Sequence, residues 1–301
     1  MSPKWAGVFP AITTKFKADF SIDFSAIEKH VEAQIAAGVH GIIVLGSLGE
    51  NGALTGPEKQ EVLKLAVKAI NRRVPVLSGV AETTTAGACA FVDAARKNGA
   101  DGFMVLPAMQ YVADRRETLT HLRAVAKASD QPIMIYNNPV SYRIDVTPEM
   151  FAELADEPRF VALKESSDDV RRITDIRNLT GDRFQIFMGV DDLALESFML
   201  GADGWVAGLV CAFPKETVAL FKLAKAGRFE EALKLYRWFM PLLHLDVSTK
   251  LVQNIKLAEA IVGLGTEHVR PPRLPLIGEE RRRVESIVRR ALETRPALPE
   301  I

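Results

Sequence analysis

Short runs of apolar residues recur along the first three-quarters of the chain, and each is followed by a polar turn and a stretch with helical periodicity. Runs of this kind, with few charges inside them, are typical of strands that are buried on both faces. Eight of them predict strands at residues 7–12, 41–45, 74–80, 102–106, 132–136, 160–164, 184–188 and 204–208. Strands this apolar indicate a parallel sheet covered by helices.

The segments between these runs carry apolar residues at helical spacing. Residues 23–37, for example, place Ile27, Val31 and Ile35 on one face. The next helix is expected to start after Thr55 and a later one after Thr147, because each threonine is followed by proline and glutamate, which suit a first helical turn. Further helices are predicted at residues 84–98, 114–128, 168–178, 191–200 and 214–226.

This alternation predicts an α/β protein with a (β/α)8 TIM barrel over residues 1–226, because eight strand–helix units in about 250 residues make the usual barrel. Residues 227–301 break the alternation, since helices without intervening strands are predicted at residues 229–245, 249–262 and 278–292. We expect these to form a C-terminal helical extension. A doubly wound open sheet is the alternative, but the first run is followed by Thr13-Thr14-Lys15-Phe16 and not by a GxGxxG turn.

Composition and charge narrow the classes of function. Lys plus Arg and Asp plus Glu both number 38, so the formal net charge is zero and neither nucleic acid nor an anionic membrane is an expected partner. The start of the chain lacks the apolar segment of a signal peptide, and no run is long enough to span a membrane, so we expect a cytoplasmic protein. Cys89 and Cys211 form no CxxC pair, and the histidines show neither HxH nor HExxH spacing. No metal site is therefore predicted, and all five histidines are expected to be structural.

Candidate chemistry is expected where the strands end, because barrel enzymes carry their active sites there. The sixth run ends on Lys164, and burial at that point disfavours an ammonium group. A neutral amine attacks carbonyls, so Lys164 is a candidate to form a Schiff base; the alternative is a lysine that extends its ammonium to water. The fifth run ends on Tyr136, whose hydroxyl can carry protons; the alternative is a core tyrosine with a satisfied hydroxyl.

The turn after the second run is rich in glycine, with the sequence Gly46-Ser47-Leu48-Gly49-Glu50. Its backbone N–H groups and the Ser47 hydroxyl can hold a small carboxylate, although a plain tight turn is the alternative. Lys164, Tyr136 and this turn together predict a site for a 2-oxo acid, in which the amine attacks the oxo group. The candidate substrate-binding residues are Gly46, Ser47, Leu48 and Glu50 in this turn, with Asn138, Asp191 and Gly208 after later strands.

These motifs, with Tyr136-Asn137-Asn138-Pro139 and Ala162-Leu163-Lys164-Glu165-Ser166, resemble the dihydrodipicolinate synthase / N-acetylneuraminate lyase family of class I Schiff-base lyases. The order and spacing match over most of the chain. The resemblance implies Lys164 as the Schiff-base residue, Tyr136 as its proton-shuttling partner, and Ser47 with the backbone of Leu48 as the site for the substrate carboxylate. It also implies a homotetramer that uses no cofactor and no metal.

Several positions depart from the pattern of the synthase itself. The synthase has two hydroxyl residues where this chain has Ser47-Leu48, and a tyrosine pair where this chain has Ala108-Met109. The synthase also has an arginine at the position of Ser141; in this chain Arg143 lies two residues further on. Weaker cues resemble a subgroup that deaminates and dehydrates 1-pyrroline-4-hydroxy-2-carboxylate to 2,5-dioxopentanoate. They are Leu106–Met109, Tyr136–Val140, Lys164–Asp169 and Leu243–Asp246.

We therefore expect such a deaminase, acting on a small 2-oxo or 2-imino acid. One alternative is 4-hydroxy-tetrahydrodipicolinate synthase, and another is an aldolase that cleaves a 2-keto-3-deoxy sugar acid, with Asp191 and Asp192 near the substrate hydroxyls. Release of ammonia would distinguish the deaminase from an aldolase that releases pyruvate. A further alternative is a barrel that only binds a 2-oxo acid, which the pairing of Lys164 with Tyr136 argues against, because a binding protein needs no nucleophilic amine.

Overall fold

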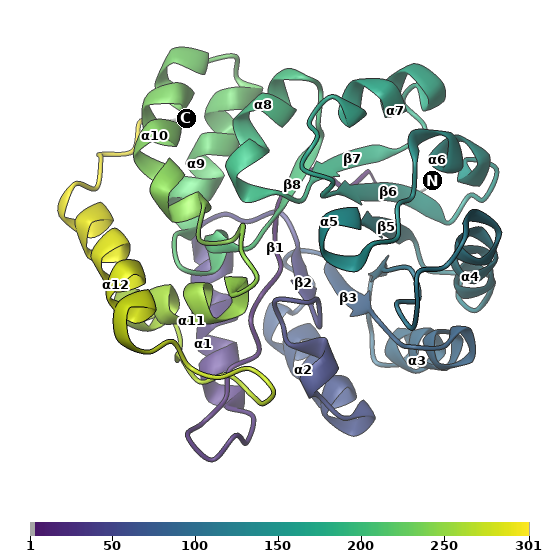
Figure 1. Ribbon diagram of the computed structural model, residues 1–301, viewed down its shortest axis with the longest axis horizontal. Coiled ribbons are helices and arrows are strands. Elements are labelled where there is room, and N and C mark those ends of the chain that lie inside the picture. Colours follow the sequence, from purple (N-terminus) through teal and green to yellow (C-terminus); the bar gives the residue numbers. More distant parts are fainter. Residues whose placement is uncertain (1–3, 301) are drawn as a thin grey trace.

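Eight parallel strands follow one another around a barrel in the computed structural model, which describes residues 4–300 (Figure 1). Neighbours in sequence pair along the sheet, and β1 pairs with β8. An Ala11–Ile43 bridge links the ends of β1 and β2. The strands are β1 (Gly7–Pro10), β2 (Ile42–Val44), β3 (Val76–Val80), β4 (Gly102–Val105), β5 (Ile133–Asn137), β6 (Phe160–Glu165), β7 (Gln185–Met188) and β8 (Gly204–Ala207). The predicted (β/α)8 barrel is confirmed, and the sheet is not the open doubly wound alternative.

Helices surround the strands, and they form in the segments that were predicted to be helical. They are α1 (Phe24–Ala36), α2 (Gly56–Ile70), α3 (Thr85–Lys97), α4 (Arg115–Lys127), α5 (Pro139–Tyr142), α6 (Pro148–Leu154), α7 (Arg172–Thr180), α8 (Ala194–Met199), α9 (Pro214–Lys225), α10 (Phe229–Leu243), α11 (Leu251–Val262) and α12 (Gly278–Glu293). None of the helices within residues 4–300 is long and apolar enough to cross a membrane.

Two helices depart most from the prediction. The helix expected from residue 168 starts only at Arg172, because Asp168 adopts a left-handed φ of 62° and the Asp169 carboxylate accepts a hydrogen bond from the Arg171 N–H. The four-residue helix α5 lies in a stretch where only a loop was expected. Asn138 caps it by accepting a hydrogen bond from Ser141 N–H, and Pro139 suits its first position.

Side chains on alternate positions of the strands fill the inside of the barrel. One from each strand forms this layer: Phe9, Ile43, Leu77, Met104, Met134, Ala162, Phe187 and Val206. Because successive strand side chains alternate between faces, Tyr136 lies two residues beyond Met134 on the inward face, and Lys164 two residues beyond Ala162. The register of β5 and β6 pairs Tyr136 with Lys164. The fold therefore places these two side chains side by side at the carboxyl end of the barrel.

Helices α10, α11 and α12 form the C-terminal extension and lie together on one side of the barrel (Figure 1). Helix α10 packs on α8 and α9, and α11 packs on α12. The extension is fastened to the loop after β7, since the Tyr236 hydroxyl donates to the Asp192 carbonyl and His244 Nδ1 lies 2.7 Å from Asp192 Oδ2. The connection between α10 and α11 is thereby held close to the carboxyl ends of the strands.

Candidate active site

Lys164 is buried, and its amine has no bonding partner in the part of the chain that the structure describes. Its side chain is buried, with 7% of the residue exposed, and its Nζ lies 4.0 Å from the centre of the Tyr136 ring. Within residues 4–300 this Nζ takes part in no hydrogen bond or ion pair. Burial lowers the pKa of Lys164, while the charges of Asp246, Tyr142 and Asp191 act in the opposite direction. The ammonium group of Lys164 therefore loses its proton more readily than that of an exposed lysine.

Two glycines provide space for the functional groups at this end of the barrel. A Cβ on Gly189, just after β7, would lie 2.4 Å from Lys164 Cε and 2.0 Å from Ser166 Oγ. A Cβ on Gly208, just after β8, would lie 2.1 Å from Asp246 Oδ1. Since real Cβ contacts are longer than this, any side chain at either position would displace its neighbour. Gly208, a predicted substrate-binding residue, is thus a residue that makes room for Asp246.

Three hydroxyl groups connect β5, which pairs with β6 on one side of Lys164, to the turn after β2. They belong to Tyr136, Tyr142 and Ser47, and we call them the hydroxyl side. Tyr142 is the last residue of α5, and its ring meets that of Tyr136 edge-on with the ring centres 5.9 Å apart. The Tyr142 hydroxyl also forms a hydrogen bond with Ser47 Oγ. Burial raises the pKa of both tyrosines, so both hydroxyls keep their protons at neutral pH. The hydroxyl side therefore links β5 to the turn after β2 within one chain.

The predicted turn after β2 is available to an anion. Its shape is held by hydrogen bonds from Glu50 N–H to the Ser47 carbonyl and from Asn51 N–H to the Gly46 carbonyl. The N–H groups of Ser47 and Leu48 donate no hydrogen bond within residues 4–300. Ser47 is half-buried, whereas the Leu48 side chain is buried in the core. Two unused N–H groups beside a hydroxyl make a suitable cradle for a carboxylate.

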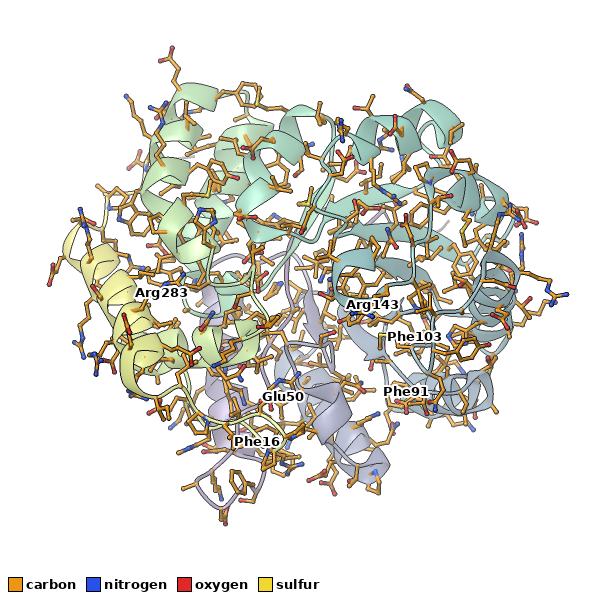
Figure 2. All side chains as sticks on the ribbon, viewed as in Figure 1. Phe16, Glu50, Phe91, Phe103, Arg143 and Arg283 are labelled. Carbon is orange, nitrogen blue, oxygen red and sulfur yellow. The ribbon has the colours of Figure 1, made fainter. Side chains whose placement is uncertain are left out.

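Glu50 was also predicted to bind substrate, but its carboxylate is engaged elsewhere. It forms a fully buried ion pair with Lys256 at 2.5 Å and accepts a hydrogen bond from Arg270 N–H. Lys256 also lies over the ring of Phe16, which Figure 2 shows beside Glu50. A buried charge needs such a partner, so Glu50 is committed to joining the turn to the C-terminal extension.

Two carboxyl groups lie on the other side of Lys164, which we call the carboxyl side: those of Asp191 and Asp246. Asp191 is fully buried and accepts hydrogen bonds from Trp205 Nε1 at 2.9 Å, Leu209 N–H at 2.8 Å and Gly208 N–H at 3.2 Å. Burial raises the pKa of Asp191 to about 6. Its oxygens are occupied by the protein, which leaves them little capacity for the substrate hydroxyls expected there.

Asp246 comes from the connection between α10 and α11 and is half-buried. Its carboxylate forms no hydrogen bond or ion pair in the described part of the chain. Burial raises its pKa well above the usual value, and the charge of Asp191 adds to the increase. Asp246 therefore retains its proton far more readily than a surface aspartate does.

Asn138 and Arg143 complete the surroundings of Tyr136. Asn138 donates from Nδ2 to the Tyr136 hydroxyl at 3.0 Å while its Oδ1 caps α5. It was predicted to bind substrate, and in the structure it orients Tyr136. Arg143, which is labelled in Figure 2, follows α5 with a left-handed φ of 60°. It is exposed and has no ion pair among residues 4–300.

The sequence analysis did not place Tyr142 or Asp246 in the site. A tyrosine shortly after the Tyr136-Asn137-Asn138-Pro139 motif was the available signal for Tyr142. For Asp246, the signal was an acidic residue among the subgroup cues, without any indication that it faces Lys164.

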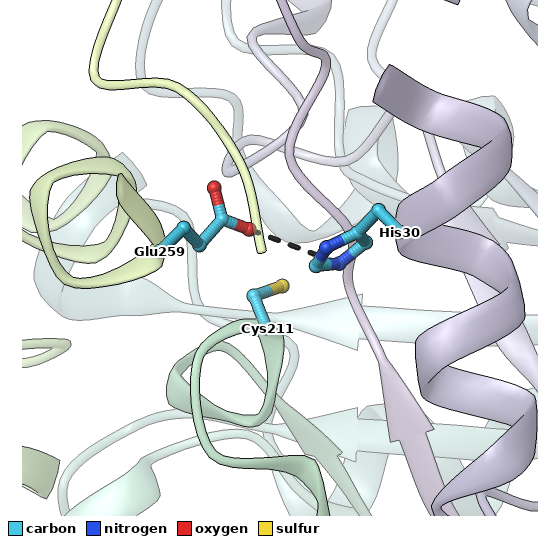
Figure 3. A group of neighbouring side chains, drawn as sticks. All are labelled: His30, Cys211 and Glu259. Atoms are coloured by element: carbon cyan, nitrogen blue, oxygen red, sulfur yellow. Dashed lines mark ion pairs between the residues drawn. The ribbon is translucent and has the colours of Figure 1, made fainter. Parts of the chain in front are cut away.

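A second buried cluster joins α1, α11 and the segment after β8 (Figure 3). His30, Cys211 and Glu259 offer potential metal ligands within 4.8 Å of one another. However, Lys15 Nζ already lies 2.6 Å from Glu259 Oε1, and both nitrogens of His30 have polar neighbours, the Leu264 carbonyl and Gln34 Nε2. A metal cation would have to displace this ammonium, so the donor set fits a buried ion pair better than a metal.

Residues 4–291 match the model of the Dihydrodipicolinate synthetase family. The chain belongs to this family. It is 32% identical over 273 residues to the 4-hydroxy-tetrahydrodipicolinate synthase of Methanospirillum hungatei, covering 90% of this chain and 92% of the relative. It is 30% identical over 291 residues to the synthase of Kosmotoga olearia, covering 95% and 97%.

Solved structures of the family agree in fold. Dihydrodipicolinate synthase from Bacillus anthracis superposes with a TM-score of 0.92 at 28% identity, covering 96% of this chain and 99% of the other. The enzyme from Acinetobacter baumannii, solved with pyruvate, gives 0.91 at 26%, covering 95% and 98%. The family resemblance seen in the motifs is thus confirmed, whereas none of these relatives is named as a pyrroline-carboxylate deaminase.

Proposed function

We propose that this chain forms a Schiff base between Lys164 Nζ and the C2 carbon of a small 2-oxo or 2-imino acid. The buried amine beside Tyr136, which has no ion-pair or hydrogen-bond partner in residues 4–300, is the observation that carries the proposal. The amine attacks C2, and loss of water, or opening of a cyclic imine, leaves a protonated imine. This imine withdraws electrons from C3, so removal of a C3 proton gives an enamine that makes or breaks bonds at the next carbon.

The hydroxyl side suits the proton transfers of this chemistry. The Ser47 hydroxyl and the N–H groups of Ser47 and Leu48 would hold the substrate carboxylate, which orients C2 toward Lys164. Tyr142 bonds to Ser47 through its hydroxyl and meets the ring of Tyr136 edge-on, so these three hydroxyl residues would pass protons between them. Tyr142 would thereby supply within one chain a second tyrosine that Ala108-Met109 do not provide.

The names of the relatives favour carbon–carbon bond formation as the reaction. All of those given above are called synthases, which supports 4-hydroxy-tetrahydrodipicolinate synthase activity better than the deaminase expected from the weaker cues. In that reaction the enamine formed from pyruvate adds to the aldehyde of aspartate semialdehyde. Consumption of both compounds by the wild-type chain would support this function.

Deamination of 1-pyrroline-4-hydroxy-2-carboxylate is a second candidate because of the carboxyl side. An acid at Asp246, together with Ser141 in place of an arginine, is less suited to a second anionic substrate than to a hydroxyl or an amino group. Ammonia release from the pyrroline, with no condensation of pyruvate and aspartate semialdehyde, would favour this candidate.

The covalent catalyst is a side chain, so we propose a reaction without a cofactor, and we propose a homotetramer as the assembly. Light scattering on the purified chain tests the latter.

Exchange of the pyruvate methyl protons in D2O, followed by NMR, tests the enamine directly. Lys164→Ala should abolish exchange, whereas Lys127→Ala, at an exposed position, should leave it unchanged. Exchange in Lys164→Ala at the wild-type rate would contradict the proposed function.

A further inference from the structure

We propose that Asp246 transfers a proton to and from the oxygen atom on C4 of the substrate. This inference rests on the proposed function, because it places the substrate on Lys164. It adds a residue from the C-terminal extension to a site otherwise made by the barrel.

The order of the strands around the barrel sets the direction of the substrate. Strand β2, which precedes the Ser47 turn, lies opposite β6, which carries Lys164, and β7, β8 and β1 lie between them on one side. A substrate held by its carboxylate at Ser47 and by C2 at Lys164 has one remaining substituent on C2, the chain that begins at C3. The hydroxyl side is occupied by Tyr136 and Tyr142, so C3 and C4 extend toward the carboxyl side.

Asp246 is the carboxyl group free to act there. Its Oδ1 lies beside Gly208, 2.1 Å from where a Cβ would stand, and the lack of a side chain at Gly208 leaves it room. Asp191 is bound by three protein donors, whereas Asp246 has no polar partner in residues 4–300. Two nearby carboxyls in such different environments divide into a fixed anion and a proton donor. The raised pKa of Asp246 agrees with the donor role.

The connection that carries Asp246 is held in place. Leu245, its neighbour, is buried, and the Leu245 carbonyl accepts a hydrogen bond from Asn254 Nδ2 at 2.9 Å. On the other side His244 contacts Asp192 at 2.7 Å. Asp246 is therefore presented by a fixed segment, as an acid that must meet one substrate atom requires.

The same proton transfer serves both candidate reactions. In elimination, the nitrogen lone pair re-forms the C2=N bond of the protonated imine, the C2=C3 electron pair moves to form a C3=C4 double bond, and the C4–O bond breaks with its electron pair on oxygen. The leaving oxygen takes the proton of Asp246 and departs as water, leaving an Asp246 carboxylate. In condensation, C3 of the enamine bonds to the aldehyde carbon, which becomes C4, and the aldehyde oxygen takes the proton to become a hydroxyl. Asp246 then regains a proton from solvent.

Pyruvate has no C4, which separates the role of Asp246 from that of Lys164. The experiment compares wild type, Asp246→Asn and a control, Asp169→Asn, whose carboxylate lies in the loop after β6 and pairs with exposed Arg171. Each is assayed for pyruvate methyl exchange in D2O and for turnover of three C4-oxygen reactions: 1-pyrroline-4-hydroxy-2-carboxylate, 2-keto-3-deoxygluconate, and pyruvate with aspartate semialdehyde.

Asp246→Asn should keep pyruvate exchange within about threefold of wild type and lose at least about a hundredfold in turnover, the usual scale for loss of a general acid. Asp169→Asn should match wild type in both assays. Turnover by Asp246→Asn near the wild-type rate would overturn the role of Asp246 and leave the proposed function intact, as would an equal loss in exchange and turnover. Wild-type turnover of none of the three would overturn the role of Asp246, because no C4 oxygen would then receive its proton. Absence of exchange in wild type would overturn the proposed function, and this inference with it.

Discussion

Replacing Gly189 with alanine should disable Lys164 while leaving the fold in place. The new Cβ would lie 2.4 Å from Lys164 Cε, and ordinary contacts begin at 3.4 Å, so the lysine must shift by about 1 Å. Because this Cβ would also lie 2.0 Å from Ser166 Oγ, the Lys164 side chain cannot move away toward Ser166. Because a displacement of about 1 Å can cost about a hundredfold in rate, we expect pyruvate methyl exchange to fall by about that factor.

The assay needs a control for the general effect of adding a methyl group. Gly52 lies in the turn after β2, and a Cβ there would meet nothing within 4 Å. Gly52→Ala should therefore exchange pyruvate at the wild-type rate, and both variants should give the circular dichroism spectrum of the folded barrel. Wild-type exchange in a folded Gly189→Ala would refute the reasoning that the space beside Gly189 sets the position of the amine.

Three further predictions concern the hydroxyl side, the buried ion pair and pH. Tyr142→Phe should lower turnover about a hundredfold or more while pyruvate still forms an adduct, and loss of the adduct instead would assign Tyr142 to binding. Glu50→Gln leaves Lys256 buried without its partner and should cost about 3–5 kcal/mol in urea unfolding; a change under about 1 kcal/mol would contradict a buried pair. Burial and the charge of Lys15 lower the pKa of His30 from 6.5 to about 4 in the folded chain. As the pH falls, His30 therefore binds a proton in the unfolded chain before it does so in the folded chain. The free energy of unfolding should drop by about 3 kcal/mol between pH 6.5 and 4, and His30→Gln should reduce this pH dependence, as urea unfolding at each pH would show.

The fold was predictable because its signals are local. Apolar runs repeat eight times, and a parallel sheet buried on both faces imposes that pattern on each unit. The same logic located Lys164 and Tyr136, since the end of a strand is visible in the sequence. It could not give their register, which follows from how β5 and β6 pair.

The remaining site residues depend on contacts between distant parts of the chain. Glu50 looks like a ligand in a glycine-rich turn, but its partner Lys256 is 206 residues away and nothing local indicates the pairing. Asp246 follows a helix outside the barrel repeat and reaches the site only because α10 is fastened to the loop after β7. Tyr142 depends on a four-residue helix, which is too short to have a periodicity.

The central claim is that Lys164 forms a Schiff base, and borohydride reduction in the presence of pyruvate tests it most directly. Reduction turns the imine into a stable amine, so intact mass and peptide mapping report both its formation and its place. The account predicts one adduct per chain, located on Lys164 and absent from Lys164→Ala. No adduct in wild type, or an adduct mapped to another lysine, would contradict it.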